Sequence, residues 1–337
     1  MNGWEARLAW RTFNFNWLPI AALGLALAVA TGGTGFSLEP VAFGVTCAVA
    51  FALASIVYAQ WFLKADAADP KLVFWVGPTA QVILITAIVG PLSYIANAFN
   101  WPLQDQALLS IDRAMGMDPE AIVAFVNNHP WLAKCLDSSY GFIKWPLLGV
   151  PIVLAMTLRL IRLQQFILAL VIALAVTIVV SIFVPAVGTY YGLNVSPKQF
   201  PFVDASIYAA QLRDIQLLRD GSLRHLELFK IAGIVSFPSF HAASAVLYMW
   251  ALWPVRGFKS AAIAINALMI AATPVVGAHY VIDVIAGIVV AAASILLAKH
   301  FVLMFAPGKP RDIKASFAAD LQPGVRPVRV AADAIKI

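Results

Sequence analysis

Long runs without charged or histidine side chains occupy much of the chain. Residues 12–38, 40–63, 72–104 and 163–197 contain no Asp, Glu, Lys, Arg or His. A helix that crosses the hydrocarbon core of a bilayer needs about 20 mainly apolar residues. Each run is long enough for such a helix, so the pattern predicts an all-α, polytopic membrane helical bundle.

The full pattern predicts eight transmembrane helices and an orientation for them. We expect the helices at residues 17–33, 41–63, 72–98, 136–158, 163–186, 237–255, 260–277 and 279–298. Alternate short connections and the chain ends carry the basic residues Arg7, Arg11, Lys64, Lys71, Arg159, Arg162, Arg256, Lys259 and Lys299. The opposite short turns contain no Lys or Arg, so the positive-inside rule places both termini in the cytoplasm.

Two long connections are then expected on the outer side. The first, residues 101–134, contains Asp118-Pro119-Glu120, which is typical of a helix start. The second, residues 188–236, has apolar residues at helical spacing over 206–218 and a stop signal at Gly221. We expect the tail after Pro307 to be a disordered cytoplasmic end.

Composition excludes several classes of protein. Hydrophobic residues make up 61% of the 337 residues and charged residues 12%, against about 25% charged residues in an ordinary globular protein. The net charge of +6 lies mostly at the ends of apolar runs, which indicates membrane topology rather than nucleic-acid binding. Two cysteines exclude a disulfide framework. No Gly-rich phosphate loop is present, which argues against an ATP-driven machine.

Two segments interrupt the apolar pattern with chemically active residues. One is residues 237–243, which contain His241, and the other is residues 277–283, which contain His279. The two histidines are 38 positions apart, which suffices for one helix across the membrane and one back. We therefore expect both histidines on the same outer face, each at the start of a helix.

His279 and Asp283 have the spacing of one helical turn. A carboxylate inside the membrane costs about 2.5–3.5 kcal/mol without a partner, and a histidine N–H provides one. The acid then fixes the tautomer of the imidazole and leaves the other ring nitrogen free as a base or nucleophile. The alternative is a structural His–Asp pair that connects two helices.

The segment Pro238-Ser239-Phe240-His241 predicts the N-terminus of a helix. We expect the N–H groups of Ser239, Phe240 and His241 to be free there and to bind a phosphate oxygen. His241 would lie beside that phosphate and protonate a leaving group. Alternatively, Ser239 is only an N-cap and His241 an interfacial residue.

The segments FPSFHAASAV and GAHYVIDVIAG resemble the second and third signature motifs of the type 2 phosphatidic acid phosphatase superfamily. They are most similar to its inositolphosphotransferase branch, which includes inositol phosphorylceramide synthase. The resemblance extends over about residues 105–303, with less specific matches at LSIDRAMGMDPE, Tyr140 and Val184-Pro185-Ala186-Val187-Gly188. It implies a six-helix core at 69–303, two additional helices at 1–68 and a tail at 304–337.

The resemblance also implies a two-step phosphoryl transfer that uses no metal and no cofactor. His279 would attack phosphorus and form a phosphohistidine, with Asp283 orienting its ring. His241 would act as the general acid for the departing alcohol. Water would then resolve the intermediate in a phosphatase, and an acceptor hydroxyl would resolve it in a transferase.

The chain departs from the superfamily pattern at two places that normally supply cations. The first motif, a lysine followed seven residues later by Arg-Pro, does not occur, and Ala272 and Thr273 stand where the third motif carries Ser-Arg. Other groups must then bind the phosphate, because charge stabilisation is usually the largest catalytic contribution. The substrate-binding candidates are Ser239, Phe240, Lys144, Tyr140 and Arg219.

Two classes of function remain. The favoured one is a lipid phosphatase or phosphotransferase acting on a lipid phosphate or phospholipid at the outer face, with transfer slightly favoured over hydrolysis. It would lie in a bacterial inner membrane and bind no nucleic acid. The alternative is a proton-coupled transporter in which Asp283, Lys144 and the histidines relay protons. Against that alternative, the sequence contains no convincing repeat, and its polar residues gather at one face rather than at the midplane.

Overall fold

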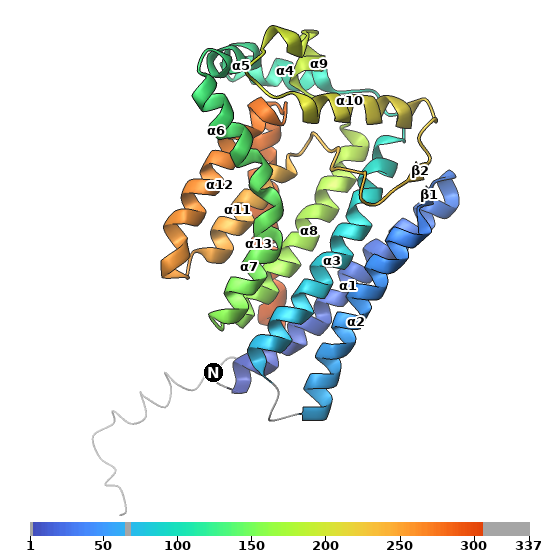
Figure 1. Cartoon of the computed structure of the whole chain (residues 1–337), viewed down its shortest axis with the longest axis vertical. Coiled ribbons are helices and arrows are strands. Elements are labelled where there is room, and N and C mark those ends of the chain that lie inside the picture. The colour runs from blue at the N-terminus through green and yellow to red at the C-terminus, as the bar shows by residue number, and fades with distance from the viewer. Residues whose placement is uncertain (1–2, 65–68, 306–337) are drawn as a thin grey trace, which may run out of the picture.

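Long helices run side by side through the molecule, and short helices cross one of its ends (Figure 1). The computed structural model describes residues 3–64 and 69–305, and the tail expected to be disordered lies outside these residues. The elements are α1 Gly3–Thr34, β1 Ser37–Leu38, α2 Pro40–Lys64, α3 Pro70–Asn97, α4 Asp105–Ala114, α5 Pro119–Asn127, α6 Pro130–Tyr140, α7 Lys144–Met156, α8 Leu160–Phe183, α9 Thr189–Leu193, α10 Ser206–Arg219, β2 His225–Leu226, α11 Phe240–Leu252, α12 Arg256–Val276 and α13 Val281–Met304.

Seven helical spans in the described residues are long and apolar enough to cross a membrane. The continuous stretch Pro130–Met156, made of α6 and α7, counts as one of them. The protein is therefore an all-α polytopic membrane bundle, as the apolar runs predicted.

The sixth expected span, residues 237–255, corresponds to α11, which is shorter than predicted. It has 13 residues, or about 20 Å of helix, against a hydrocarbon thickness of about 30 Å. Prolines bound it on both sides, because Pro238 precedes its N-cap and Pro254 follows Trp253. A helix usually ends at or before the residue preceding a proline.

The fourth expected span, residues 136–158, is not one uninterrupted α-helix. A 3-10 turn at Gly141–Ile143 separates α6 from α7. Pro146 lacks the N–H that would bond to the carbonyl of Phe142 in a continuous α-helix. The side chain of Tyr140 is buried and that of Lys144 is exposed.

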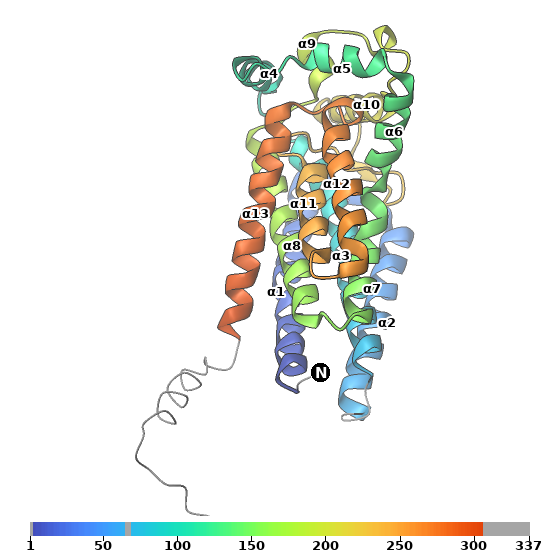
Figure 2. The ribbon, with the colours of Figure 1, turned by 90° about the vertical axis from the view of Figure 1, so that its left-hand side faces the viewer.

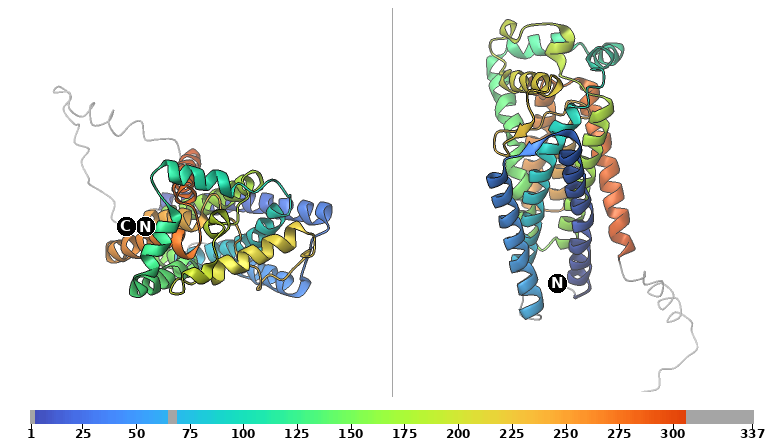
Figure 3. Two further views of the ribbon diagram at one scale, coloured as in Figure 1. Left: turned by 90° about the horizontal axis from the view of Figure 1, so that it is seen from above. Right: turned by 90° about the vertical axis from the view of Figure 1, so that its right-hand side faces the viewer.

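The short connections with basic residues lie at one end of the bundle and the α12–α13 connection at the other, as predicted. The α7–α8 and α11–α12 connections lie at the same end of the bundle as the start of α1, and the α12–α13 connection lies at the other (Figures 1 and 2). The short helices α4, α5, α9 and α10 cover that second end (Figure 3). Helices α5 and α10 begin at the predicted places, and Gly221 after α10 has a φ of +88°.

Helix α8 forms the centre of the bundle, in contact with α1, α3, α11 and α13. Its side chains Phe166, Ile167 and Leu170 are fully buried. Helices α2 and α13 instead expose large apolar side chains such as Phe62 and Leu296. Such apolar outer surfaces belong against lipid rather than water.

The two N-terminal helices are joined to the rest of the molecule at both ends. Within the bundle, the Asn16 side-chain amide of α1 donates to the side-chain oxygen of Gln164 on α8 at 3.1 Å. At the end covered by short helices, β1 pairs in parallel with β2, with Ser37 opposite His225. The loop that leads from α10 to α11 is therefore held by the α1–α2 connection.

Candidate functional site

Ser239 begins α11 and attaches it to α13. Its hydroxyl accepts a bond from the N–H of Ala242 at 3.4 Å, which confirms the predicted N-cap. Its own N–H donates to the carbonyl oxygen of Asp283 at 3.0 Å. The expectation that this N–H is free is therefore wrong. The N–H groups of Phe240 and His241 have no acceptor among the described residues.

His279 lies in the tight connection between α12 and α13, two residues before α13 begins. The preceding Ala278 has a φ of +53°, which turns the chain sharply. A Cβ on Gly277 would lie 2.6 Å from the Tyr140 hydroxyl and 2.7 Å from the His279 ring. A residue without a side chain at position 277 therefore leaves room for Tyr140 and His279. The sequence predicted His279 at the start of a helix. In the structure it lies just before α13, in the preceding turn.

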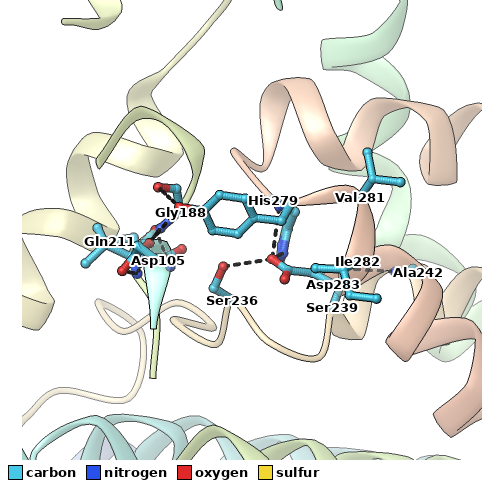
Figure 4. Close-up of polar contacts among 12 residues, drawn as sticks. Asp105, Gly188, Gln211, Ser236, Ser239, Ala242, His279, Val281, Ile282 and Asp283 are labelled. Carbon is cyan, nitrogen blue, oxygen red and sulfur yellow. Dashed lines mark hydrogen bonds and ion pairs between the residues drawn. The ribbon is translucent and has the colours of Figure 1, made fainter. Parts of the chain in front are cut away.

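Asp283 collects three donors on one carboxylate oxygen (Figure 4). Its Oδ2 lies 3.3 Å from Nδ1 of His279 and accepts from the Tyr280 N–H at 3.0 Å and the Ser236 hydroxyl at 3.1 Å. With its proton on Nδ1, His279 donates to the acid and leaves Nε2 unprotonated. His279 is 3% exposed and Asp283 is 0% exposed. The predicted His–Asp pair is confirmed.

The ring of His241 lies beside this pair. The ring centroids of His241 and His279 are 6.4 Å apart. Tyr140 stacks on His241 with a centroid distance of 3.9 Å and an interplanar angle of 10°. The prediction that the two histidines meet at one end of the bundle is confirmed, and Tyr140 lies in the same cluster.

Two aspartates of α4 support the segment that carries His279. The carboxylate of Asp112 accepts the N–H groups of Val281 at 2.7 Å and Ile282 at 2.9 Å, so it caps the start of α13. Asp105 lies two helical turns earlier on the same face and accepts the N–H groups of Val187 and Gly188. Helix α4 is therefore bonded to both chain segments that approach His279.

Tyr280 connects Asp105 to the α12–α13 turn. Its hydroxyl lies 3.0 Å from Oδ1 of Asp105 and 3.0 Å from the carbonyl oxygen of Gly188. Burial raises the pKa of Tyr280, and the nearby Asp105 charge raises it further. The phenol therefore stays protonated and donates. Burial also raises the pKa of Asp105, although its bonds from Gly188 and Val187 partly offset that effect.

The backbone segments around Gly188 and Ala278 approach each other closely. Its φ is +131°, and a Cβ there would lie 2.5 Å from the carbonyl oxygen of Ala278. That carbonyl accepts the N–H of Thr189 at 2.8 Å. The backbone around residue 188 therefore packs directly against the residue that precedes His279.

Lys144 and Arg219 form no hydrogen bond or ion pair with either histidine in the described residues. Lys144 begins α7 with an exposed side chain and forms no hydrogen bond or ion pair within residues 3–64 and 69–305. One amino group of Arg219 donates to the carbonyl oxygen of Trp101 at 3.0 Å. Phe240 is partly buried and packs against the core. Roles for these three in substrate binding stay predictions.

Sequence reasoning missed the groups that position the site. They are Asp105, Asp112, Gly188, Ser236 and Tyr280. The seven-residue spacing of the two aspartates on a short helix was one available signal, because it places both on one face. Ser236 carried no signal apart from its position just before the His241 segment.

One comparison with known proteins matches the part of the chain that carries this constellation. A model of the PAP2 superfamily matches residues 106–297, a range that extends from α4 into α13 and covers more than half of the chain. No curated protein and no solved structure matches the chain. The matched range contains both histidines, Asp283 and the aspartate that caps α13. The chain belongs to the PAP2 superfamily.

Proposed function

We propose that this protein is an integral membrane enzyme that removes or transfers the phosphate group of a phosphorylated lipid through a phosphohistidine intermediate. Membership of the PAP2 superfamily supports a lipid phosphatase type of activity. The observation that carries the proposal is the His279–Asp283 pair at 3.3 Å with the His241 ring 6.4 Å away. A nucleophile, a group that orients it and a second proton carrier are then in one place.

In the first step, Nε2 of His279 attacks phosphorus. A nitrogen–phosphorus bond forms and the bond from phosphorus to the departing oxygen breaks. His241 in its protonated form gives its proton to that oxygen. Asp283 stabilises the positive charge that develops on the His279 ring through the Nδ1–Oδ2 contact.

In the second step, an incoming hydroxyl group attacks the phosphohistidine. His241, now neutral, takes its proton, and the nitrogen–phosphorus bond breaks. Water as the attacking group yields free phosphate, and a lipid or headgroup hydroxyl yields a transferred phosphate. Both histidines return to their starting protonation states.

The N-terminus of α11 supports phosphate binding next to His241. The Phe240 and His241 N–H groups lack an acceptor in the described part of the chain, and the N-terminus of an α-helix favours an anion. By contrast, the carboxylate of Asp112 already occupies the first N–H groups of α13. We therefore place the phosphate at α11, with Tyr140, Ser239, Lys144 and Arg219 kept as candidates for the surrounding contacts.

Transfer is slightly favoured over hydrolysis, as in the inositolphosphotransferase branch. The chain lacks the superfamily's first motif with its Lys and Arg. His279 is 3% exposed, so its surroundings limit the access of water to a phosphorylated ring. An acceptor hydroxyl held within the site would then compete well with water.

The distribution of basic residues supports an outer-face location for the site. The α7–α8 connection contains Arg159, and Arg256 follows the α11–α12 connection. Both connections lie at the end of the bundle opposite the α12–α13 connection, which carries His279 (Figure 1). The positive-inside rule places that end in the cytoplasm.

We further propose that α1 and α2 are an addition to a six-helix core at residues 69–303. The family match, residues 106–297, begins after these two helices and also after α3.

The test is a panel of phospholipids and lipid phosphates incubated with purified protein and EDTA, with mass spectrometry of both free phosphate and exchanged headgroups. We expect product from at least one lipid, inhibition by vanadate and no product from His279→Ala. Product made equally well by His279→Ala would contradict the mechanism. Solute uptake driven by a proton gradient, without any phosphate product, would favour the transporter instead.

A further inference from the structure

A charged cavity lies at the end of the bundle opposite the histidines. It has a volume of 490 Å³ and is formed mainly by the α7–α8 connection and the first turns of α8, with Glu5 of α1 and Pro254 closing its sides. Helix α8 has 24 residues, so the cavity lies about 36 Å along the helix from the end that approaches Gly188. It is therefore separate from the candidate active site.

Two arginines dominate the charge of this cavity. Arg159 and Arg162 both line it, against the single acid Glu5. Arg162 also has an unusual environment, because its Nε is buried and has no hydrogen-bond partner among the described residues. An arginine that only extends to water would keep its guanidinium hydrated. The guanidinium of Arg162 is instead partly enclosed in the wall of the cavity.

The ring of Trp250 fixes the position of Arg162. The guanidinium carbon lies 3.9 Å from the centroid of that ring, and Nζ of Lys299 lies 5.6 Å from the same centroid. Stacking uses the flat face of a guanidinium and leaves its terminal amino groups able to donate. The cavity thus has a preorganised planar donor and a second cation nearby.

The backbone adds donors to the same wall. Residues Leu160, Ile161 and Arg162 line the cavity, and their N–H groups have no acceptor in the part of the chain that the structure describes. They belong to the first turn of a 24-residue helix, where the helix dipole favours negative charge. The side-chain and backbone donors therefore favour the same kind of ligand.

We propose that this cavity binds a phosphate group, and that the phosphate is carried by an anionic phospholipid of the adjoining leaflet. A tetrahedral oxyanion accepts from both an arginine fork and a helix N-terminus. The cavity volume is within the range of small-molecule sites, about 300–1,000 Å³. Leu158 and Trp253 are exposed next to it, and Lys259 lies 3.7 Å over the Trp253 ring. Such a border of tryptophan and basic residues is typical of the headgroup region.

The experiment measures lipid retention by native mass spectrometry on the full-length protein. The protein is equilibrated in detergent with equal amounts of phosphatidylglycerol and phosphatidylcholine, and the retained lipids are counted. Arg159→Gln and Arg162→Gln are compared with Arg256→Gln. Arg256 is an exposed arginine at the same end that does not line the cavity. A separate arm adds inorganic phosphate as a competitor.

We expect the wild-type protein and Arg256→Gln to retain phosphatidylglycerol over phosphatidylcholine. Each cavity variant should weaken that retention about tenfold. Displacement of the lipid by millimolar inorganic phosphate would support a phosphate site in the cavity and would show that it also binds free phosphate. Equal retention by wild type and both cavity variants, with no effect of phosphate, would overturn the proposal. Arg159 is exposed, so its variant keeps the test valid even where Arg162→Gln fails to fold. The outcome is independent of the proposed phosphoryl transfer, because none of these residues contacts the histidines in the structure.

Discussion

The hydroxyl of Tyr280 lies 3.0 Å from a carboxylate oxygen of Asp105. This contact joins α4, which lies across the end of the bundle, to the turn that positions His279. The N–H of the same tyrosine bonds to Asp283. Tyr280 therefore connects the aspartate of α4 to the acid that pairs with His279.

The variant Tyr280→Phe tests this connection. It removes a donor from a buried carboxylate, which costs about 1–3 kcal/mol, and it loosens the turn next to His279. We expect turnover of the best lipid of the panel to fall about tenfold, a change of about 1.4 kcal/mol in the barrier. The kinetic assay and a thermal unfolding curve in detergent measure the two effects.

Tyr248→Phe is the matched control. Tyr248 is also fully buried, and its hydroxyl donates to the carbonyl oxygen of Ile143 at 3.1 Å. We expect it to lose stability without losing turnover. Equal loss of turnover in the two variants would show that Tyr280 has no specific positioning role.

Gly188→Ala tests the close approach between residue 188 and Ala278. The new Cβ would lie 2.5 Å from the Ala278 carbonyl oxygen, at a φ of +131°. We expect a loss of about 1–3 kcal/mol in stability. Gly233→Ala is the control, since no atom lies within 4 Å of a Cβ at that position. Equal unfolding temperatures for the two variants would contradict the contact.

The Asp105→Asn variant tests the environment of the α4 carboxylate through its pH dependence. Burial raises the pKa of Asp105 above its unfolded value of about 3.9, so the folded state binds the proton more tightly. The stability from this group is full below the unfolded pKa and is lost as pH rises through the folded pKa. We expect the unfolding temperature of wild type relative to Asp105→Asn to be higher at about pH 4 than at about pH 7.

Asp220→Asn should show the opposite trend. Hydrogen bonds from Ser222 lower the pKa of this exposed acid, so its contribution is present above the unfolded pKa and is lost as pH falls. We expect the unfolding temperature of wild type relative to Asp220→Asn to be higher at about pH 7 than at about pH 4. The same trend in both variants would contradict a raised pKa of Asp105 in the folded state.

His241→Gln tests the assignment of the general acid. General acid catalysis contributes roughly 10²–10⁴-fold, and we expect a loss of that size with a lipid alcohol as the leaving group. A nitrophenyl phosphate leaves without protonation, so the loss of the first-step rate should shrink strongly with that substrate. Single-turnover release of nitrophenol measures it. An equal loss with both leaving groups would remove His241 from the role of acid.

The apolar pattern alone predicted most of the architecture. Four long runs without charges indicated membrane helices, and the count of positions between His241 and His279 placed both rings at one end of the bundle. The pattern overestimated the sixth span, because apolar residues continue on both sides of α11 although Pro238 and Pro254 bound the helix. Hydrophobicity does not record where backbone hydrogen bonding stops.

The same reasoning could not predict the hydrogen bonds that position the segment around His279. Asp105 and Tyr280 are 175 positions apart, and Asp112 caps a helix that begins 169 positions later. Local spacing cannot show such bonds, since they depend on how α4 lies across the end of the bundle. The free N–H expected for Ser239 was wrong for the same reason, because its acceptor is the distant carbonyl of Asp283.

The most direct measurement of the central claim is covalent labelling of the protein by its substrate. The panel lipid that is turned over is prepared with ³²P in its phosphate group, mixed with the enzyme and quenched within one turnover. We predict a label on the wild-type protein that is stable in base, is released by mild acid and maps to the peptide containing His279. His279→Ala should carry no label and form no product. Full turnover by His279→Ala, or a label on another residue that persists in this variant, would contradict the account.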